Sequence, residues 1–124
     1  MPTPVLMLLP ILSALSAAAI ADDDGLEPGQ RSPGDMSVAE RVQMIQATNT
    51  YNDCVYQQAT DKINSDADIR RIADNALHSC QPQLDGLQRL IAGWKFPAYF
   101  AKGYARTVRD HAARNILPEL ATHK

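Results

Sequence analysis

The sequence predicts an all-α protein, a small up-and-down bundle of about four helical segments with a disulfide-stapled helical hairpin in its N-terminal half. Three observations predict this fold class. Apolar residues recur at steps of three and four over most of residues 37–117, no stretch alternates with period two, and β-branched residues do not cluster. A single domain of residues 37–124 is long enough for one hydrophobic core.

The first helix is predicted over residues 37–63. Ser37 and Glu40 have the spacing of a capping box, in which a hydroxyl and a carboxylate each accept a hydrogen bond from a backbone N–H group. Asn49 and Asn52 interrupt the apolar arc of this helix, either as exposed residues on a slightly curved helix or as a buried hydrogen-bonding pair that faces a ligand. At 100° per residue, the arc predicted to be buried contains Val38, Val42, Ile45, Tyr56, Ala59 and Ile63.

Two further helical segments follow a turn at residues 64–66. Ser65 or Asp66 is the predicted N-cap, and Asp68 complements the helix dipole. Pro82 either ends the second segment or kinks it, because proline lacks a backbone donor and clashes with the preceding turn. The apolar face of the two segments consists of Ile69, Ile72, Ala73, Ala76, Leu77, Cys80, Leu84, Leu87, Leu90 and Ile91.

The last helix is predicted over residues 98–117, after a break at residues 93–97. Pro97 suits its first turn, and Pro118 is expected to end it. Its inner stripe is made of small residues, which permit the close approach of another helix, either in the same molecule or in a homodimer. This stripe is Ala101, Ala105, Val108, Ala112 and Ile116.

The first 36 residues are predicted to lie outside the fold. Residues 5–21 are apolar and free of charge and end in Ala-Ile-Ala, which is typical of a secretory signal peptide (residues 1–21) cleaved near Ala21–Asp22. The usual positively charged start is missing, and retention as a membrane anchor is the alternative, although the run is shorter than the roughly 20 residues of a span. Residues 22–36 are acidic and rich in Gly and Pro, so a flexible linker is expected.

Export predicts the state of the only two cysteines. In an antiparallel helical hairpin, the numbers of two facing residues sum to twice the number at the centre of the turn. Cys54 and Cys80 give a centre at residue 67, within one helical turn of residues 64–66. A structural Cys54–Cys80 disulfide across the first hairpin is therefore expected, in the periplasm or outside the cell.

The charges are unevenly distributed along the chain. Residues 22–85 contain twelve acids and five bases, whereas residues 86–124 contain seven bases and two acids. Either the two halves pack together and their fields partly cancel, or the basic half presents a face to an anionic lipid, a glycan or an acidic partner. Nucleic acid is not an expected partner, because the sequence has no nucleic-acid motif and export removes the protein from the cell interior.

Five of the seven aromatic residues lie within residues 94–104, where Lys95 and Lys102 are interleaved with them. Either the aromatic side chains plug the end of the bundle beneath the lysine stems, or they form an exposed surface. Protein interfaces and the headgroup region of membranes both use such a mixture of aromatic and basic residues. The predicted partner-binding residues are Trp94, Phe96, Tyr99, Phe100, Tyr104, Arg106 and Arg109.

Candidate chemistry is sparse. Of the three histidines, His78 is expected on a helix surface, His123 at the C-terminus and His111 in a structural position on the helix face of Phe100 and Tyr104. No catalytic motif, phosphate-binding loop, haem site or metal-ligand spacing is found. We therefore expect no enzyme activity, no cofactor and no metal.

These features predict an exported, non-enzymatic interaction protein, such as an inhibitor, an accessory subunit or an assembly factor. It would bind an envelope or extracellular protein, with contact to a membrane surface as a further expectation, through residues 94–109. The alternative is a small-molecule carrier with a cavity near Asn49, Asn52, Tyr56 and the aromatic segment.

Overall fold

The computed structural model describes residues 28–123, and this part of the chain is helical without strands. A 3-10 helix, η1 (Pro33–Asp35), precedes the four α-helices α1 (Val38–Asp61), α2 (Ile69–Ser79), α3 (Gln81–Gly93) and α4 (Ala98–His123). The predicted fold class is confirmed. The predicted signal peptide, the first part of the predicted linker (residues 22–27) and Lys124 lie outside the described residues.

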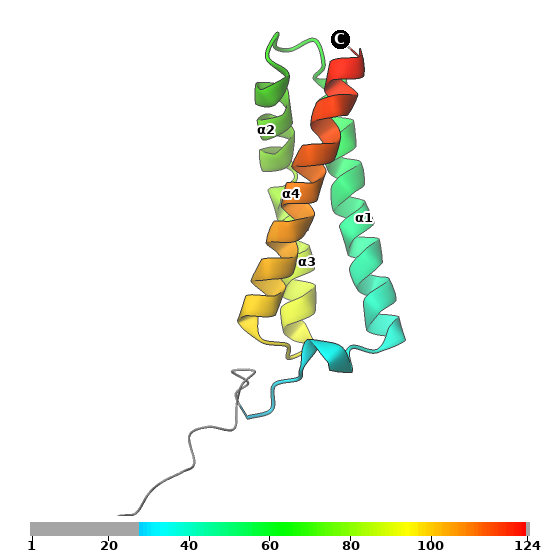
Figure 1. Cartoon of the computed structure of the whole chain (residues 1–124), viewed down its shortest axis with the longest axis vertical. Coiled ribbons are helices and arrows are strands. Elements are labelled where there is room, and N and C mark those ends of the chain that lie inside the picture. Colours follow the sequence, from blue (N-terminus) through cyan, green and yellow to red (C-terminus); the bar gives the residue numbers. More distant parts are fainter. Residues whose placement is uncertain (1–27, 124) are drawn as a thin grey trace, which may run out of the picture.

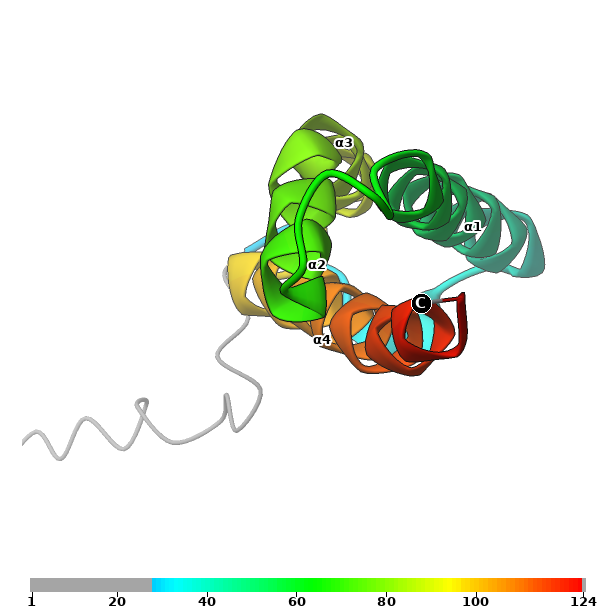
Figure 2. The ribbon, with the colours of Figure 1, turned by 90° about the horizontal axis from the view of Figure 1, so that it is seen from above.

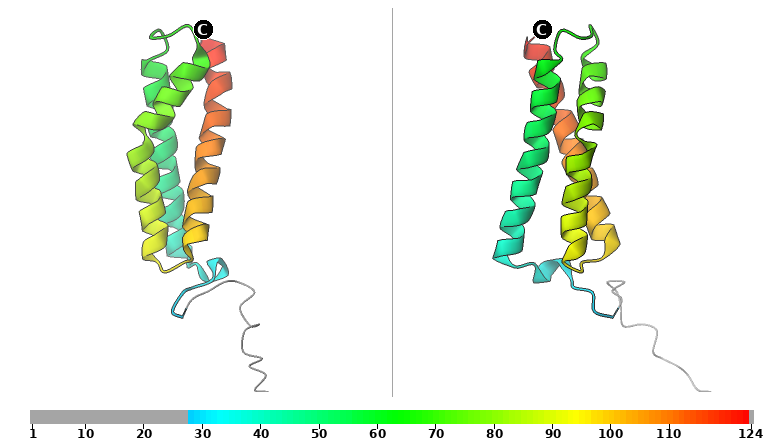
Figure 3. Two further views of the ribbon diagram at one scale, coloured as in Figure 1. Left: turned by 90° about the vertical axis from the view of Figure 1, so that its left-hand side faces the viewer. Right: turned by 180° about the vertical axis from the view of Figure 1, so that it is seen from behind.

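The four helices form three arms, and each arm runs antiparallel to the one before it in the chain. α1 runs the length of the molecule, α2 and α3 return end to end as one broken arm, and α4 runs parallel to α1 (Figures 1 and 3). We call the end at which α1 begins the lower end, as it is drawn in Figure 1. Seen along the bundle, the arms occupy the corners of a triangle, and α1 and α4 pack against each other less closely than either packs against the α2–α3 arm (Figure 2).

Capping residues set where α1 and α2 begin. The predicted capping box is present: Glu40 N–H donates to Ser37 Oγ at 3.1 Å, and Ser37 N–H donates to Glu40 Oε1 at 2.9 Å. The prediction of Ser65 or Asp66 as the N-cap of α2 is wrong, because Asp68 occupies this position and accepts from the backbone N–H of Arg70 at 3.0 Å. α2 therefore begins two or three residues later than those caps would place it.

The two prolines inside the helical regions act differently. Pro82 lies in the first turn of α3, where its missing N–H costs nothing, and the arm breaks at Cys80 just before it. The prediction that α4 ends before Pro118 is wrong, since α4 continues to His123. Leu120 explains the difference: its side chain is fully buried, and burying a leucine stabilises by about 2 kcal/mol, which offsets much of the cost of the proline.

The core lies between the three arms and includes the small-residue stripe predicted for the last helix. All five residues of this stripe are buried inside the molecule, so the stripe serves to pack α4 against the other arms. At the lower end the rings of Trp94, Phe96, Phe100 and Tyr104 pack against the core between the arms. The core residues are Tyr51, Val55, Ala59, Ile72, Ala73, Ala76, Leu77, Cys80, Leu84, Leu87, Ile91, Phe96, Ala101, Ala105, Val108, Ala112, Ile116 and Leu120.

The buried face of α1 is not the predicted one. Ala59 is buried and Ile63 is half-buried, as expected, but Val38, Val42, Ile45 and Tyr56 are exposed, with 79%, 47%, 49% and 48% of their surface accessible. The residues that face the core are instead Met44, Ala47, Tyr51, Val55 and Ala59, which also follow steps of three and four. α1 thus carries two apolar stripes, and only one of them is used in the fold.

The predicted disulfide is present and explains how α1 is rotated. Cys54 and Cys80 are bonded, with their Cα atoms 5.9 Å apart, and no cysteine is free. The bond ties α1 to the junction between α2 and α3. Because Cys54 lies about 160° around the helix from Val38, turning Cys54 toward the α2–α3 arm turns the stripe of Val38 outward.

The last part of the predicted flexible linker is in contact with the bundle. Arg31 N–H donates to the carbonyl oxygen of Lys95 at 2.9 Å, and η1 leads directly into the N-cap of α1. Lys95, in the turn between α3 and α4, has a left-handed backbone with φ of 67°. Residues 31–36 of the predicted linker therefore lie against the lower end of the bundle, where Arg31 finds hydrogen-bond partners.

Candidate functional site

The aromatic residues of the predicted binding segment form a chain of rings at the lower end of the bundle. Ring centroids are 6.4 Å apart for Trp94 and Phe96, 5.6 Å for Phe96 and Phe100, and 6.4 Å for Phe100 and Tyr104. We call these four residues the aromatic cluster. Phe96 is buried and the other three are half-buried, so the cluster closes the end of the core while part of its surface remains accessible.

Arg31 joins the aromatic cluster to α1. Its Cζ atom lies 4.6 Å from the centre of the Phe96 ring, and its two terminal nitrogens donate to the two carboxylate oxygens of Glu40 at 2.7 and 2.8 Å. The hydrogen bond from Arg31, together with those from Ser37, lowers the pKa of Glu40 from 4.5 to about 2. The same hydrogen bond raises the pKa of the Arg31 guanidinium. No sequence motif predicts the contact between Arg31 and Glu40, because the two residues lie on either side of a turn.

The basic residues of the segment lie on the outer side of α4. Tyr99, Lys102, Arg106 and Arg109 fall within an arc of about 80° on the helix, and all four are exposed, Tyr99 with 60% of its surface accessible. We call these four residues the basic face. None of its three cations forms an ion pair with another described residue.

The ion pairs also show how the uneven charges are arranged. Within residues 28–123 they join Arg31 to Glu40 and Arg71 to Asp66 and Asp68, and the side chains of His123 and Glu119 lie 3.4 Å apart. Each of these pairs lies within one half of the sequence, and none joins a residue before position 86 to one after it. The basic half is thus not neutralised by direct contacts with the acidic half in this part of the chain.

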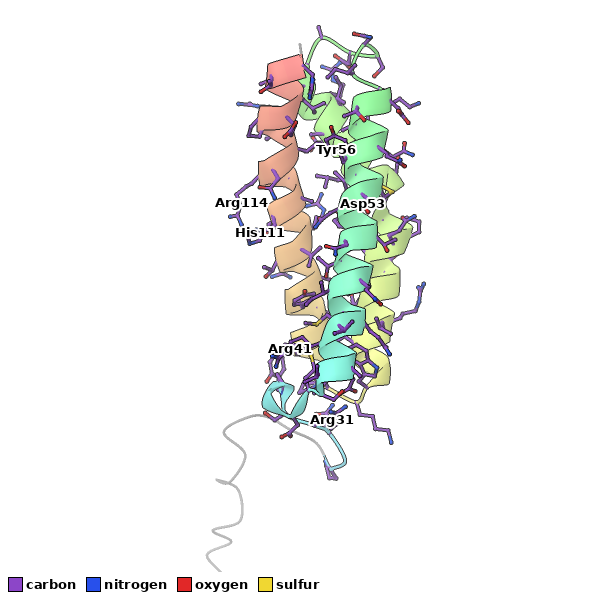
Figure 4. The ribbon with its side chains drawn as sticks, turned by 90° about the vertical axis from the view of Figure 1, so that its right-hand side faces the viewer. Arg31, Arg41, Asp53, Tyr56, His111 and Arg114 are labelled. Atoms are coloured by element: carbon purple, nitrogen blue, oxygen red, sulfur yellow. A yellow bond between two sulfur atoms is a disulfide. The ribbon has the colours of Figure 1, made fainter. Side chains whose placement is uncertain are left out.

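A groove follows the line where α1 and α4 meet, on nearly the opposite side of α4 from the basic face. Figure 4 looks onto this side, with Asp53 and Tyr56 on α1 and His111 and Arg114 on α4. One part of the groove is a pocket of about 310 Å³ with a floor of buried apolar residues and a polar rim. The pocket is lined by Asn52, Asp53, Val55, Tyr56, Ala112, Asn115, Ile116 and Glu119.

The groove continues downward past the middle of the bundle. A second pocket shares Asn52 and Asn115 with the first and reaches Tyr104. There, Tyr104 and Thr48 share a hydrogen bond of 3.1 Å between their hydroxyl oxygens, which ties α4 to α1 below the groove. The structure thus brings Asn52 and Tyr56 to one cavity, as the carrier alternative expects, whereas Asn49 is exposed outside its lining.

The remaining candidates for chemistry are dispersed. His78 is exposed on α2 as predicted, His111 is exposed beside the groove, and His123 pairs with Glu119 at 3.4 Å. Among residues 28–123, no three His, Cys, Asp or Glu side chains are placed to hold a metal ion. Asp53 and Asp61 are both exposed, eight residues apart on α1, and share no pocket.

The surface that sequence reasoning missed is the unused stripe of α1. We call Val38, Val42, Ile45, Asn49, Asn52 and Tyr56 the α1 stripe; all six are exposed. The signal that identifies it is the position of Cys54 on the opposite side of the helix, which directs the stripe away from the hairpin partner.

Comparisons of the chain with known protein families, with curated proteins and with solved structures found no match. None of the helices within residues 28–123 combines the length and the apolar character that crossing a bilayer requires. The disulfide indicates an oxidising environment, such as the periplasm or the cell exterior.

Proposed function

We propose that the protein is an exported, non-enzymatic interaction protein whose basic face binds an acidic surface of an envelope or extracellular protein. The observation that supports this proposal is the exposure of Lys102, Arg106 and Arg109 without ion-pair partners among the described residues. A cluster of exposed cations accelerates the encounter with an acidic partner and favours one orientation of that partner on the surface.

The aromatic residues would contribute in two ways. Tyr99 stands exposed among the cations, and tyrosine beside arginine is a common combination at the centre of protein interfaces. Trp94, Phe100 and Tyr104 offer only part of their surface, and Phe96 offers none, because these rings also hold the lower end together. We therefore assign the main contacts of the predicted segment 94–109 to its exposed residues and a supporting role to the aromatic cluster.

Export by a cleaved signal peptide is the second part of the proposal. The disulfide supports it, because such bonds persist in oxidising compartments. Intact mass measurement of the protein recovered from its natural compartment tests it. We expect a polypeptide that begins at Asp22 and lacks two hydrogens relative to the reduced form. A mass that corresponds to residues 1–124 with two free thiols would refute export.

A charge-reversal pair tests the binding surface. Arg106→Glu is expected to lower capture of the natural partner from envelope extract by at least about tenfold, because it places a like charge against an acidic surface. Arg70→Glu is the matched control: Arg70 is also exposed and forms no ion pair with a described residue, but it lies on α2 at the upper end. The affinity of the wild-type protein for its partner should fall as the ionic strength rises, because salt screens the attraction between opposite charges.

The outcome that contradicts the proposal is equal capture by both variants. Circular dichroism melting of each variant shows whether the fold is retained, and both substitutions lie on exposed helix surfaces where retention is expected. Equal loss of capture with unchanged melting would place the binding surface elsewhere on the molecule.

The pocket of about 310 Å³ supports the carrier as a second candidate function. Its apolar floor and the amides of Asn52 and Asn115 fit a small molecule with an apolar body and hydrogen-bonding groups. Native mass spectrometry of the purified protein tests this candidate. A carrier retains a bound mass from the expression host, and Ala112→Trp, which fills the floor of the pocket, should release it. A protein that carries no additional mass contradicts the carrier function.

A further inference from the structure

The α1 stripe has the residue spacing of a coiled-coil interface. Its positions 38, 42, 45, 49, 52 and 56 are separated alternately by four and three residues, and the same spacing continues to Ala59 and Ile63. Sustained spacing of this kind places residues along one line where a second helix can pack. Because the fold uses the other stripe of α1, the side chains at positions 38–56 of this series are exposed, whereas Ala59 is buried and Ile63 is half-buried against the core.

We propose that the protein forms a symmetric dimer in which the α1 stripes of two copies pack against each other in antiparallel orientation, with Asn49 of each copy facing Asn52 of the other. In this register the numbers of facing residues sum to 101. Ile45 then meets Tyr56 of the second copy. This inference is independent of the partner proposed for the basic face.

The two asparagines select this register. If the stripes slid by one heptad in either direction, each asparagine amide would face an apolar side chain, such as Val42 or Tyr56, and would lose its hydrogen-bonding partners. Burial of an unpaired amide costs about 1–3 kcal/mol, whereas an asparagine pair across a coiled coil is satisfied. Among the antiparallel registers, only the one that we propose pairs both asparagines with asparagines.

The distribution of charge selects the antiparallel over the parallel orientation. Within the described chain, the lower end (residues 28–48 and 87–106) contains six bases and two acids, whereas the upper end (residues 51–82 and 111–123) contains four bases and six acids. Two copies side by side in parallel would bring like-charged ends together. The antiparallel arrangement places each basic end beside an acidic end, which is complementary.

The shape of the bundle leaves space for the second copy. α1 borders the groove at α4, and the side chains of Asn52 and Tyr56 belong both to the α1 stripe and to the rim of the 310 Å³ pocket. When α1 of the second copy packs along the α1 stripe, it lies beside the three arms of the first copy as a fourth helical arm. It then covers the exposed apolar surface of Val38, Val42 and Ile45. The small-residue stripe of α4, the surface expected for a homodimer, is already buried within each copy.

Sedimentation equilibrium of the full, disulfide-bonded chain tests the dimer. We expect about twice the chain mass of 13.6 kDa, or twice the mass of the processed chain if the leader has been removed. Ile45→Lys should raise the dissociation constant about 100-fold, because each symmetric dimer contains the charge twice, next to the central asparagine layer of the interface. The matched control is Gln43→Lys, an equal charge on an exposed residue of the same helix outside the stripe, which should leave the dimer intact.

Two outcomes would overturn the dimer. A wild-type protein that stays monomeric up to several hundred micromolar has no self-association through this stripe, and the stripe would then be free for a helix of another protein. Equal weakening by the two lysine variants would show that the copies meet through a different face. Unchanged melting temperatures verify that both variants retain the monomer fold.

Disulfide trapping tests the orientation separately. In the antiparallel register, residue 45 of one copy lies beside residue 56 of the other, whereas the two copies of residue 45 are about 16 Å apart along the helix, beyond the 4.4–6.8 Å that a disulfide allows between Cα atoms. A mixture of Ile45→Cys and Tyr56→Cys proteins should therefore form a mixed disulfide, and neither variant alone should form one. Efficient cross-linking of Ile45→Cys with itself would refute the antiparallel arrangement.

Discussion

Arg31 precedes every α-helix, yet its side chain contacts three separate segments. It binds the carboxylate of Glu40 at the start of α1, the carbonyl oxygen of Asp35 in η1 at 2.7 Å, and the carbonyl oxygen of Trp94 at the end of α3 at 3.3 Å. Its guanidinium also lies over the Phe96 ring. One residue therefore holds the start of α1 against the turn that closes the aromatic cluster.

Replacement of Glu40 by Gln tests this contact through its pH dependence. The pKa of Glu40 is about 2 in the fold and 4.5 ordinarily, so the contribution of its charge to stability is present above pH 4.5 and is lost as the pH falls toward 2. Glu40→Gln should therefore lower the thermal midpoint at pH 7 by a few degrees and have little effect near pH 2. Asp110→Asn, at an exposed carboxylate without an ion pair, is the control. A pH-independent effect of Glu40→Gln would contradict the role of the charge.

Tyr51 provides a second test at the scale of one residue. Its side chain is fully buried in α1, and its hydroxyl has no hydrogen-bond partner among the described residues. Burial also raises the pKa of this hydroxyl, and the charge of Arg109 opposes part of that rise. Tyr51→Phe should increase the free energy of unfolding by about 1 kcal/mol in urea denaturation, because it removes an unpaired polar atom. A loss of stability would show that the hydroxyl has a partner, such as a buried water molecule.

Among the elements, α1 shows which part of the fold the sequence predicts and which part it does not. The capping box and the apolar spacing placed the helix within two residues of its observed ends. Its orientation was mispredicted, because two apolar stripes follow the same spacing and periodicity alone does not rank them. Cys54 resolves the choice. Because only one face of α1 can reach Cys80, the disulfide fixes the rotation of the helix about its axis, and the valines of the other stripe remain exposed.

α4 allows a test of how burial competes with a helix-breaking residue. Pro118 is exposed inside the helix, and Leu120 beyond it is buried. Pro118→Ala should increase the free energy of unfolding by about 1–2 kcal/mol, because the penalty of about 3 kcal/mol for an interior proline is partly offset by the greater flexibility of alanine in the unfolded chain. Guanidinium denaturation measures the change. An unchanged midpoint would mean that the last turns of α4 contribute little to the cooperative fold.

At the scale of the whole molecule, the apolar spacing predicts the class of fold and the position of the two cysteines predicts the disulfide, but neither predicts the surfaces that the fold exposes. The same residues, 94–104, supply both the end of the core and the start of the basic face: Phe96, in the turn before α4, is buried, whereas Tyr99, in the first turn of α4, is exposed. The groove between α1 and α4 depends on how closely three arms approach one another. Such distances follow from the complete set of packed side chains, which no local spacing encodes.

The disulfide determines the stability of the molecule as a unit. The bond closes a loop whose ends are 26 residues apart, and the chain-entropy model assigns about 3.5 kcal/mol to a loop of this length. The Cys54→Ser and Cys80→Ser double variant should lose this amount in urea denaturation while it retains its helical circular dichroism signal. Reduction of the wild type with dithiothreitol should give the same loss, and a much smaller loss in both experiments would contradict the model.

The position of the bond relative to the turn between α1 and α2 has one more consequence. Residues 62–68 lie entirely between Cys54 and Cys80 and include the exposed Lys62. A trypsin-like protease that cuts the peptide bond after Lys62 would yield two fragments that remain joined through sulfur. In denaturing gel electrophoresis the cleaved protein should migrate as one species without reductant and as two fragments with reductant. The disulfide thus keeps the two fragments together, whereas a hairpin without a disulfide would separate after the same cut.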